Sequence, residues 1–539
     1  MNKPMIHNPV LKGFNPDPSI CRVGDDYYIA TSTFEWFPGV SIHHSRDLVN
    51  WRLVGYPLTR VSQLDMRGNP DSGGVWAPAL SYHNGQFWLI YSNVRGLAGP
   101  AKDLDNYLVT ADNIEGPWSE PIFLNGSGFD PSLFHDDDGR QWLLNMVWDP
   151  RKYNHAFYGI VLQAYSHELQ KLMGTPKLIF KGTELALTEA PHLYKVDGYY
   201  YLITAEGGTK YEHAVTVARS RTIDGPYEVH PENPILTSWP YLQHPLQKSG
   251  HASLVQTQQG EWYLAHLMGR PLVIPGSVPL QDRGYCPLGR ETSIQKVEWR
   301  EGWPYVVGGP GPSVQVQAPD LPPHPWPVDH RELNHFDEPA LEKHFNTLRI
   351  PFDEQLGSLT DRPGYLRLYG RDSQFSLFYS ALVARRWQSF NFLAETKMAF
   401  EPHSFQQQAG LICYYNTRNW ASAYVTWDEA LGRCLTLAVA ERGTTTHPLG
   451  KAGQIPVPDT AEHVWFLVTV SPTGYHFSYS FDGDDFTAIP VQLASHKLSD
   501  DYVNELGFFT GAFVGMHCID TTGQRLPADF DYFRYSETS

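Results

Sequence analysis

A four-residue pattern that recurs five times constrains the fold of this chain more than any other feature of its sequence. The pattern reads Asp-Pro-Ser-Ile in its first copy and begins at positions 17, 77, 130, 190 and 251, so successive units are 53 to 61 residues apart. Each copy is followed by a Gly or Asp turn and an aromatic strand, at 26–30, 86–90, 141–144, 199–202 and 261–264. Short strands around tight turns at a fixed period indicate a β-propeller, here with five blades.

Equivalent positions in the blades of a propeller lie side by side around its central axis. We therefore expect the residues at or beside the start of each unit to converge there. They comprise three carboxylates, an indole and an imidazole: Asp17, Asp130, Glu189, Trp76 and His251. Such a set around one opening favours a functional site over five independently capped strands.

The first carboxylate of this set stands between two prolines. Pro16 and Pro18 fix their own φ and disfavour the helical region for the residues before them, so we expect Asn15 and Asp17 to be extended. Taken alone, Asp17 is also consistent with a strand start closed by an Asx turn. The recurrence of the pattern is what favours a site.

The rest of the chain predicts a second domain. A chain of 539 residues exceeds the usual length of one domain. We assign 1–309 to the propeller, 310–331 to a stiff linker rich in Gly and Pro, and 332–539 to a β-sandwich of short alternating strands. No long segment has helical periodicity, so the predicted fold class is all-β.

Charge and cysteine content exclude several classes of function. The formal net charge of −17 and the lack of a basic patch argue against a nucleic-acid partner. The five cysteines are scattered and have no CxxC spacing, so neither a disulfide framework nor a zinc site is predicted. Neither a signal peptide nor an apolar run of membrane-spanning length is visible, which predicts a cytoplasmic protein without a membrane partner.

Several motifs together resemble glycoside hydrolase family 43. They are Asn-Pro-Asp-Pro at 15–18, Gly-Phe-Asp at 128–130, Thr-Glu-Ala-Pro-His-Leu at 188–193, Gly-His-Ala-Ser-Leu at 250–254 and Cys-Pro-Leu-Gly-Arg-Glu at 286–291. The resemblance extends into the second domain, with Arg-Arg-Trp-Gln-Ser-Phe at 385–390 and Gly-Phe-Phe-Thr-Gly at 507–511, as in the two-domain β-xylosidase branch. It implies a five-bladed propeller followed by a concanavalin-like sandwich. The implied activity is inverting, exo-acting hydrolysis of β-1,4-xylo-oligosaccharides, with probable α-L-arabinofuranosidase side activity.

The resemblance also implies catalytic roles. Asp17 is the expected general base, Glu189 the general acid, and Asp130 the carboxylate that orients the acid and modulates its pKa. The chemistry agrees with this assignment, because an acid that works near neutral pH must have its pKa raised by burial or by a neighbouring negative charge.

Further residues are expected to contact the sugar. Arg290 is expected to hydrogen-bond the substrate and keep Asp17 ionised, although a surface ion pair with Glu291 is the simpler interpretation of it. The other predicted contacts are Trp76, Phe34, Phe129, Thr209, His251 and Phe509. One phenylalanine of the sandwich is implied to close the subsite for the non-reducing sugar, and Phe509 is preferred to Phe508. No cofactor is predicted to be required, although His251 could hold a hydrated divalent cation such as Ca²⁺ near the axis.

Alternative functions remain open at this point. The enzyme could be mainly an arabinofuranosidase or arabinan-cleaving relative, and the fold could also serve a non-catalytic carbohydrate-binding protein. A retaining fructosidase is disfavoured, because its Asn-Asp-Pro-Asn-Gly motif is absent from the corresponding stretch. A homo-oligomer, either dimer or tetramer, is expected from relatives with this sandwich. The xylose to arabinose ratio and the chain-length preference are left open.

Overall fold

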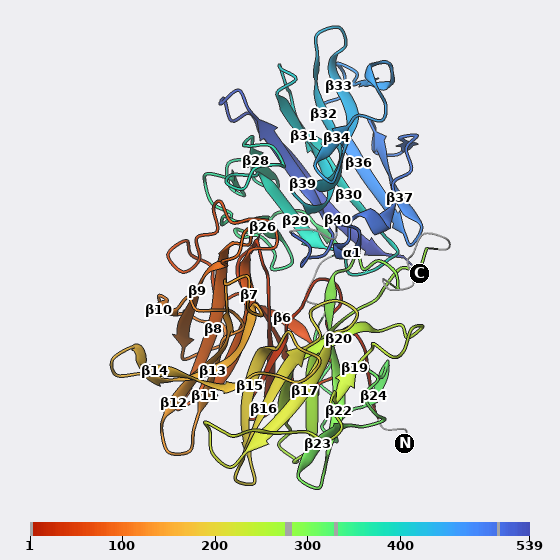
Figure 1. Ribbon diagram of the computed structural model, residues 1–539. Coiled ribbons are helices and arrows are strands. Elements are labelled where there is room, and N and C mark those ends of the chain that lie inside the picture. The colour runs from red at the N-terminus through yellow and green to blue at the C-terminus, as the bar shows by residue number, and fades with distance from the viewer. Residues whose placement is uncertain (1–3, 275–282, 328–331, 504–506, 539) are drawn as a thin grey trace.

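The computed structural model describes residues 4–274, 283–327, 332–503 and 507–538. It consists of a propeller, coloured red to green in Figure 1, and a sandwich, coloured cyan to blue, that sits on one end of it. Helical structure in these residues is limited to α1 (Asp500–Val503) and two 3₁₀ turns, η1 (Lys451–Gly453) and η2 (Ser495–Lys497). No helix in these ranges is both long and apolar enough to cross a membrane.

The propeller has five antiparallel blades in the described residues, and the strands of each blade follow chain order. The blades are β2 (Ser19–Val23), β3 (Asp26–Thr31), β5 (Ser41–Ser45) and β6 (Arg52–Gly55); β7 (Gly74–His83), β8 (Gln86–Gly96), β9 (Asp103–Ala111) and β10 (Ile122–Asn125); β11 (Ser132–His135), β12 (Gln141–Trp148), β13 (Phe157–Ser166) and β14 (Lys171–Phe180); β15 (Glu189–Val196), β16 (Tyr199–Glu206), β17 (Ala214–Ser220) and β18 (Glu228–Val229), with β19 (Leu236–Thr237) beside β17; and β20 (Gln247–Gln256), β21 (Trp262–Gly269), β22 (Arg290–Arg300) and β23 (Trp303–Val306). The five predicted aromatic strands are the second strands of these blades.

The first strands of the blades form the inner ring. Each contacts the first strands of both neighbouring blades, and β2 closes the ring against β20. Serines of the recurring pattern join the blades: Ser132 Oγ donates to the Pro191 carbonyl at 2.5 Å, and Ser253 Oγ donates to the Pro18 carbonyl at 2.8 Å. The Leu80 amide donates to Ser19 Oγ at 3.0 Å. The serines of three copies of the recurring pattern therefore form hydrogen bonds that join neighbouring blades.

The segment predicted as a linker is packed against the propeller instead. Its strand β24 (Gln315–Gln317) pairs with β1 (Met5–His7), and Val316 and Leu321 are buried in the apolar core near the first and fifth blades. Proline stiffness, which predicted a spacer, is equally compatible with an extended strand that docks on a surface. The end of the predicted linker, 328–331, lies outside the described residues.

The sandwich consists of two antiparallel sheets in the described residues. The first sheet contains, in spatial order, β27 (Gly357–Ser358), β28 (Leu366–Tyr369), β40 (Pro527–Glu537), β30 (Phe392–Ala399), β36 (Val464–Ser471), β37 (Gly474–Ser480) and β38 (Thr487–Ala488), with β25 (Leu333–Asn334) beside β40. The second contains β34 (Thr444–Thr446), β33 (Gly432–Glu441), β32 (Asn419–Asp428), β31 (Gln407–Asn416), β39 (Phe513–Asp520), β29 (Leu382–Arg386), β26 (Asn346–Leu348) and β4 (Trp36–Phe37), with β35 (Ile455–Pro456) beside β33. Alternating apolar residues of both sheets, such as Phe466 and Leu411, fill the core between them.

The two domains share structure at their junction. Strand β4 comes from the propeller part of the chain but pairs with β26 of the sandwich. The Trp36 ring of β4 stacks on Phe513 of the sandwich with ring centroids 3.6 Å apart. Arg386 Nε donates to the Phe14 carbonyl at 2.7 Å. Because one apolar cluster contains residues of both domains, the sandwich is fixed against one end of the propeller (Figure 1).

Candidate active site

The first residue of each recurring unit has a left-handed backbone. Asp17, Ala77, Asp130, Ala190 and His251 have φ values of 56°, 29°, 54°, 51° and 48°. This corrects the expectation that Asp17 is extended. A following proline disfavours the right-handed helical region, but aspartate is one of the few residue types that enter the left-handed region readily. The recurring pattern thus marks a repeated backbone kink, which lies at or before the start of the inner strand in three blades and inside β7 and β20 in the other two.

One pocket of about 380 Å³ lies between these kinks and the sandwich. All ten side chains predicted from the sequence line it, namely Asp17, Phe34, Trp76, Phe129, Asp130, Glu189, Thr209, His251, Arg290 and Phe509. The structure therefore brings the whole predicted set together. The chemical roles assigned to these residues remain predictions.

Asp17 has partners that favour its ionised form. Its Oδ2 accepts a hydrogen bond from Ser32 Oγ at 2.6 Å, and its Oδ1 accepts one from Arg290 Nη1 at 3.2 Å. His251 Nδ1 lies 3.6 Å from the same Oδ1. Burial alone would raise the pKa of Asp17, but Arg290, His251 and Ser32 together lower it below its usual value. Asp17 is therefore ionised at neutral pH, as a general base must be.

The other two carboxyl groups have the opposite electrostatics. Burial, followed by the charge of Asp17, raises the pKa of Glu189 to about 8, although Arg290 and Lys102 oppose the shift. The pKa of Asp130 is raised well above its usual value, first by burial and then by the charges of Glu189 and Asp17. Asp130 Oδ2 also accepts a hydrogen bond from the Ala190 amide at 3.0 Å, directly beside Glu189. A carboxyl group that keeps its proton at neutral pH can act as a general acid.

Aromatic rings form much of the pocket wall. Phe509 of the sandwich lies against Phe34, with ring centroids 5.8 Å apart, and edge-on to Trp76 at 5.4 Å. Trp76 also meets Phe129, with ring centroids 5.3 Å apart. The sequence left open which of two phenylalanines reaches the site, and both Phe508 and Phe509 line it. Phe509 is the one that packs against the propeller aromatics.

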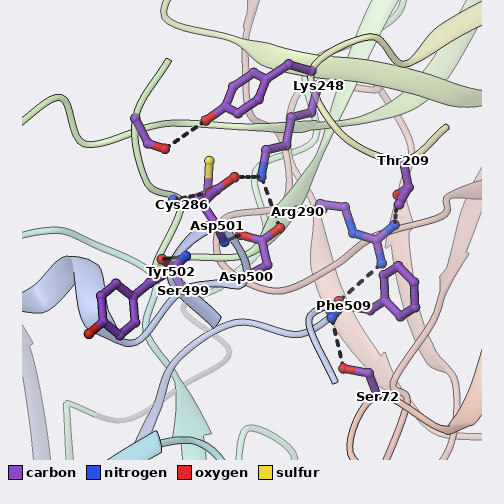
Figure 2. Close-up of polar contacts among 12 residues, drawn as sticks. Ser72, Thr209, Lys248, Cys286, Arg290, Ser499, Asp500, Asp501, Tyr502 and Phe509 are labelled. Atoms are coloured by element: carbon purple, nitrogen blue, oxygen red, sulfur yellow. Dashed lines mark hydrogen bonds and ion pairs between the residues drawn. The ribbon is translucent and has the colours of Figure 1, made fainter. Parts of the chain in front are cut away.

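The sandwich loop is tied to the propeller by backbone hydrogen bonds. The Phe509 amide donates to Ser72 Oγ at 2.8 Å, and its carbonyl accepts from Arg290 Nη2 at 3.1 Å (Figure 2). Arg290 Nη1 also donates to Thr209 Oγ1 at 3.1 Å. Arg290 thus binds the predicted base and the sandwich loop at the same time. Its ion-pair partner is Asp17 and not the neighbouring Glu291. Glu291 pairs with Arg270 instead.

Sequence reasoning missed part of the lining. The missed residues are Lys102, Trp148, Phe157, Leu187, Gly207, Gly208, Lys210 and Glu212. Lys102 Nζ lies 4.4 Å from the centroid of the Trp148 ring, and burial lowers its pKa although Glu189 opposes the shift. Most of these residues come from connections outside the recurring pattern, so only the adjacent Gly207 and Gly208 carried a local signal.

In the part of the chain that the structure describes, His251 does not belong to a cluster of metal-ligand type. Burial lowers the pKa of His251 below its usual value, so its imidazole is neutral near pH 7. Among the described residues, a group of three side chains with the spacing of metal ligands occurs at Cys286, Asp500 and Asp501, and it does not include His251. The predicted hydrated cation on His251 stays a prediction.

Comparison with known proteins agrees with this architecture. The sequence model for glycosyl hydrolases family 43 matches residues 6–304, and that for the β-xylosidase C-terminal concanavalin A-like domain matches residues 334–536. The chain is 59% identical to a β-xylosidase of Bacillus subtilis, with 99% of both chains covered. It is 49% identical to a xylosidase/arabinosidase of Humicola insolens, which covers 99% of this chain and 98% of the relative.

A solved structure matches over the same length. The crystal structure of a xylan β-1,4-xylosidase from Bacillus halodurans has a TM-score of 0.95 and 55% identity, and the match covers 99% of this chain and 100% of that one. The predicted all-β fold, a five-bladed propeller followed by a concanavalin-like sandwich, is thereby confirmed. These matches support an enzyme and not a purely carbohydrate-binding protein. The chain belongs to family 43 of the glycosyl hydrolases and is a glycoside hydrolase of its two-domain branch.

Proposed function

We propose that this enzyme is an exo-acting, inverting β-xylosidase that releases xylose from the non-reducing end of β-1,4-xylo-oligosaccharides, with α-L-arabinofuranosidase side activity. The observation that carries the proposal is an ionised Asp17 and a protonated Glu189 in one aromatic-walled pocket. An inverting glycosidase needs one carboxylate to activate water and one carboxylic acid to protonate the leaving oxygen. The names of the similar Bacillus and Humicola enzymes support the choice of sugar.

The proposed reaction proceeds in a single displacement. Asp17 accepts a proton from water as the water oxygen bonds to the anomeric carbon. Glu189 donates its proton to the glycosidic oxygen as the bond from that oxygen to the anomeric carbon breaks. Asp130 accepts a hydrogen bond from the Ala190 amide and so orients the backbone beside Glu189, while burial and the charge of Asp17 favour the protonated acid. Arg290 keeps Asp17 ionised until the reaction occurs.

Exo-action is assigned to the sandwich loop. Phe509 packs against Phe34 and Trp76, and its carbonyl is held by Arg290. A ring in this position closes the pocket beyond the terminal sugar, so a polymer cannot pass through it.

Proton NMR of xylobiose cleavage tests the proposal directly. The first product should be α-xylose, the inverted anomer. Initial β-xylose would contradict inversion, and no xylose release would contradict the proposed substrate. The second candidate is an enzyme that is mainly an arabinofuranosidase, because the Humicola relative is named a xylosidase/arabinosidase. A comparison of the rates on aryl β-xyloside and aryl α-L-arabinofuranoside distinguishes the two candidates.

The proposed reaction needs no cofactor, because the acid and the base are both supplied by the chain. Full activity after dialysis against EDTA is expected, whereas a loss restored by Ca²⁺ would favour the hydrated cation at His251. We further propose a cytoplasmic homo-oligomer, either dimer or tetramer. Light scattering during gel filtration and cell fractionation test these two points.

A further inference from the structure

A buried ion cluster lies behind the sandwich wall of the pocket (Figure 2). Lys248 of β20 has a left-handed φ of 58° and precedes the pocket residue His251 by three positions. Its ammonium lies 3.0 Å from Asp500 Oδ2 and 2.7 Å from Asp501 Oδ1, both at the start of α1 in the sandwich. The three side chains are 1%, 8% and 7% exposed. The cluster therefore joins the two domains out of contact with water.

Cys286 completes the cluster from the propeller side. Its amide donates to Asp501 Oδ2 at 2.8 Å. The Cys286 sulfur and the carboxylate oxygens of Asp500 and Asp501 lie within 4.8 Å of one another, which is the spacing of ligands around one cation. Lys248 already supplies that cation, and burial raises the pKa of the thiol so that it stays uncharged. The arrangement is complete as one ammonium held by two carboxyl groups, and burial together with the charge of Asp501 raises the pKa of Asp500 to about 7.

The cluster and the pocket wall line the same small cavity. This cavity has a volume of about 10 Å³, and its lining is Thr209, Lys210, Lys248, Arg290, Asp500, Asp501, Phe508 and Phe509. A space of this size holds at most one water molecule, so the carboxylates cannot move without moving their neighbours. Cys286 also begins the turn that ends at Arg290, whose guanidinium holds the Phe509 carbonyl.

We propose that Lys248 is a positioning residue for the sugar pocket, because its ammonium clamps Asp500 and Asp501 of the sandwich to the propeller and thereby fixes the Phe508–Phe509 wall. A buried ion pair adds little net stability compared with an apolar replacement, but an unpaired buried charge is costly. The cluster therefore specifies one relative placement of the two domains. This inference depends on the proposed function in one respect only, which is the choice of xylobiose as the assay substrate.

The test is Lys248→Met, which keeps most of the length of the side chain and removes the charge. We expect KM for xylobiose to rise about tenfold while kcat falls less than about threefold, because the wall contributes mainly to binding shared by substrate and transition state. Hydrogen exchange of the backbone amides at 507–511 should become faster, since the Phe509 amide loses its fixed position against Ser72. Arg367→Met is the matched control: it breaks the pair with Asp529 inside the sandwich and should lower Tm without changing KM or this exchange.

Unchanged exchange at 507–511 together with KM within about twofold of the wild type would overturn the proposal. If Lys248→Met does not fold, Asp501→Asn decides by the same comparison, because it removes one of the two charges that face the ammonium. Wild-type enzyme that releases no xylose would contradict the proposed function alone. The exchange measurement would still decide the role of Lys248.

Discussion

Replacing Glu189 by glutamine should stabilise the protein at alkaline pH. Burial and the charge of Asp17 raise the pKa of this carboxyl group from 4.5 to about 8 in the folded protein. The unfolded chain loses the same proton near pH 4.5. Between these two values the folded state holds one more proton than the unfolded state, so the free energy of unfolding decreases as the pH rises.

The size of the effect follows from the shift. One pKa unit corresponds to about 1.4 kcal/mol, so the change from 4.5 to about 8 costs the wild type on the order of 5 kcal/mol above pH 8. Glutamine has nearly the same shape and remains uncharged, so it does not carry this cost. Apart from a constant offset, the stability gain of Glu189→Gln should be near zero below pH 4.5 and should grow until about pH 8.

Unfolding by urea at pH 5 and pH 9 measures this difference. Asp17 does not interfere, because its lowered pKa gives stability that is lost only as the pH falls below 3.8. Glu168 is exposed, so Glu168→Gln is the control that measures the effect of a glutamate-to-glutamine change on stability without burial. A gain that is the same at both pH values would refute the reasoning, because the penalty on Glu189 would then not arise from its ionisation.

Three further predictions concern catalysis. The pH profile of kcat/KM should fall above about pH 8 as Glu189 ionises, and Lys102→Met should move this limb to higher pH because Lys102 favours the ionised form; an unmoved limb would argue against that contact. Asp17→Ala and Glu189→Ala should each lower kcat on xylobiose about 10²- to 10⁴-fold, and an aryl xyloside with a good leaving group should partly rescue only Glu189→Ala. Equal losses on good and poor leaving groups would count against Glu189 as the acid. Phe509→Ala should raise KM for xylobiose more than it lowers kcat, whereas Phe378→Ala, at an exposed phenylalanine outside the pocket, should change neither.

The recurring pattern made the centre of the site predictable. Its five copies encode the same local kink, and the three copies with a serine add hydrogen bonds between blades, so their positions in space follow from the repeat without any knowledge of tertiary contacts. Asp17, Asp130 and His251 occupy equivalent places for this reason, and Trp76 and Glu189 adjoin two others. The backbone at Asp17 was mispredicted, because the rule for residues before proline says which region is disfavoured and not which of the others is adopted.

The outer parts of the site depend on contacts that no local pattern records. Lys102 precedes β9 and Trp148 ends β12, so they belong to two different blades, and they meet only after both blades have folded. The pair between Lys248 and Asp500 joins residues 252 positions apart. Its members carry no motif on either side, and a lysine next to a strand start is ordinarily a solvent-exposed charge. Only the docking of the sandwich makes it a buried cation.

The left-handed kinks explain why the carboxylates depend on the closed ring. Each such kink costs a residue other than glycine about 1–2 kcal/mol, and Ala77 and Ala190 have no side chain that could compensate locally. The kinks instead direct backbone amides at the neighbouring blade. The Ala190 amide donates to Asp130, and the Ala77 amide donates at 2.7 Å to Ser32, whose hydroxyl donates to Asp17. The next blade therefore supplies the amide that donates to Asp130, and at Asp17 it supplies the amide that donates to Ser32, so the closed ring helps to place both carboxyl groups. The cost of the kinks is thus offset at the site itself, because in an isolated blade Asp130 would lack the Ala190 amide and Ser32 beside Asp17 would lack the Ala77 amide.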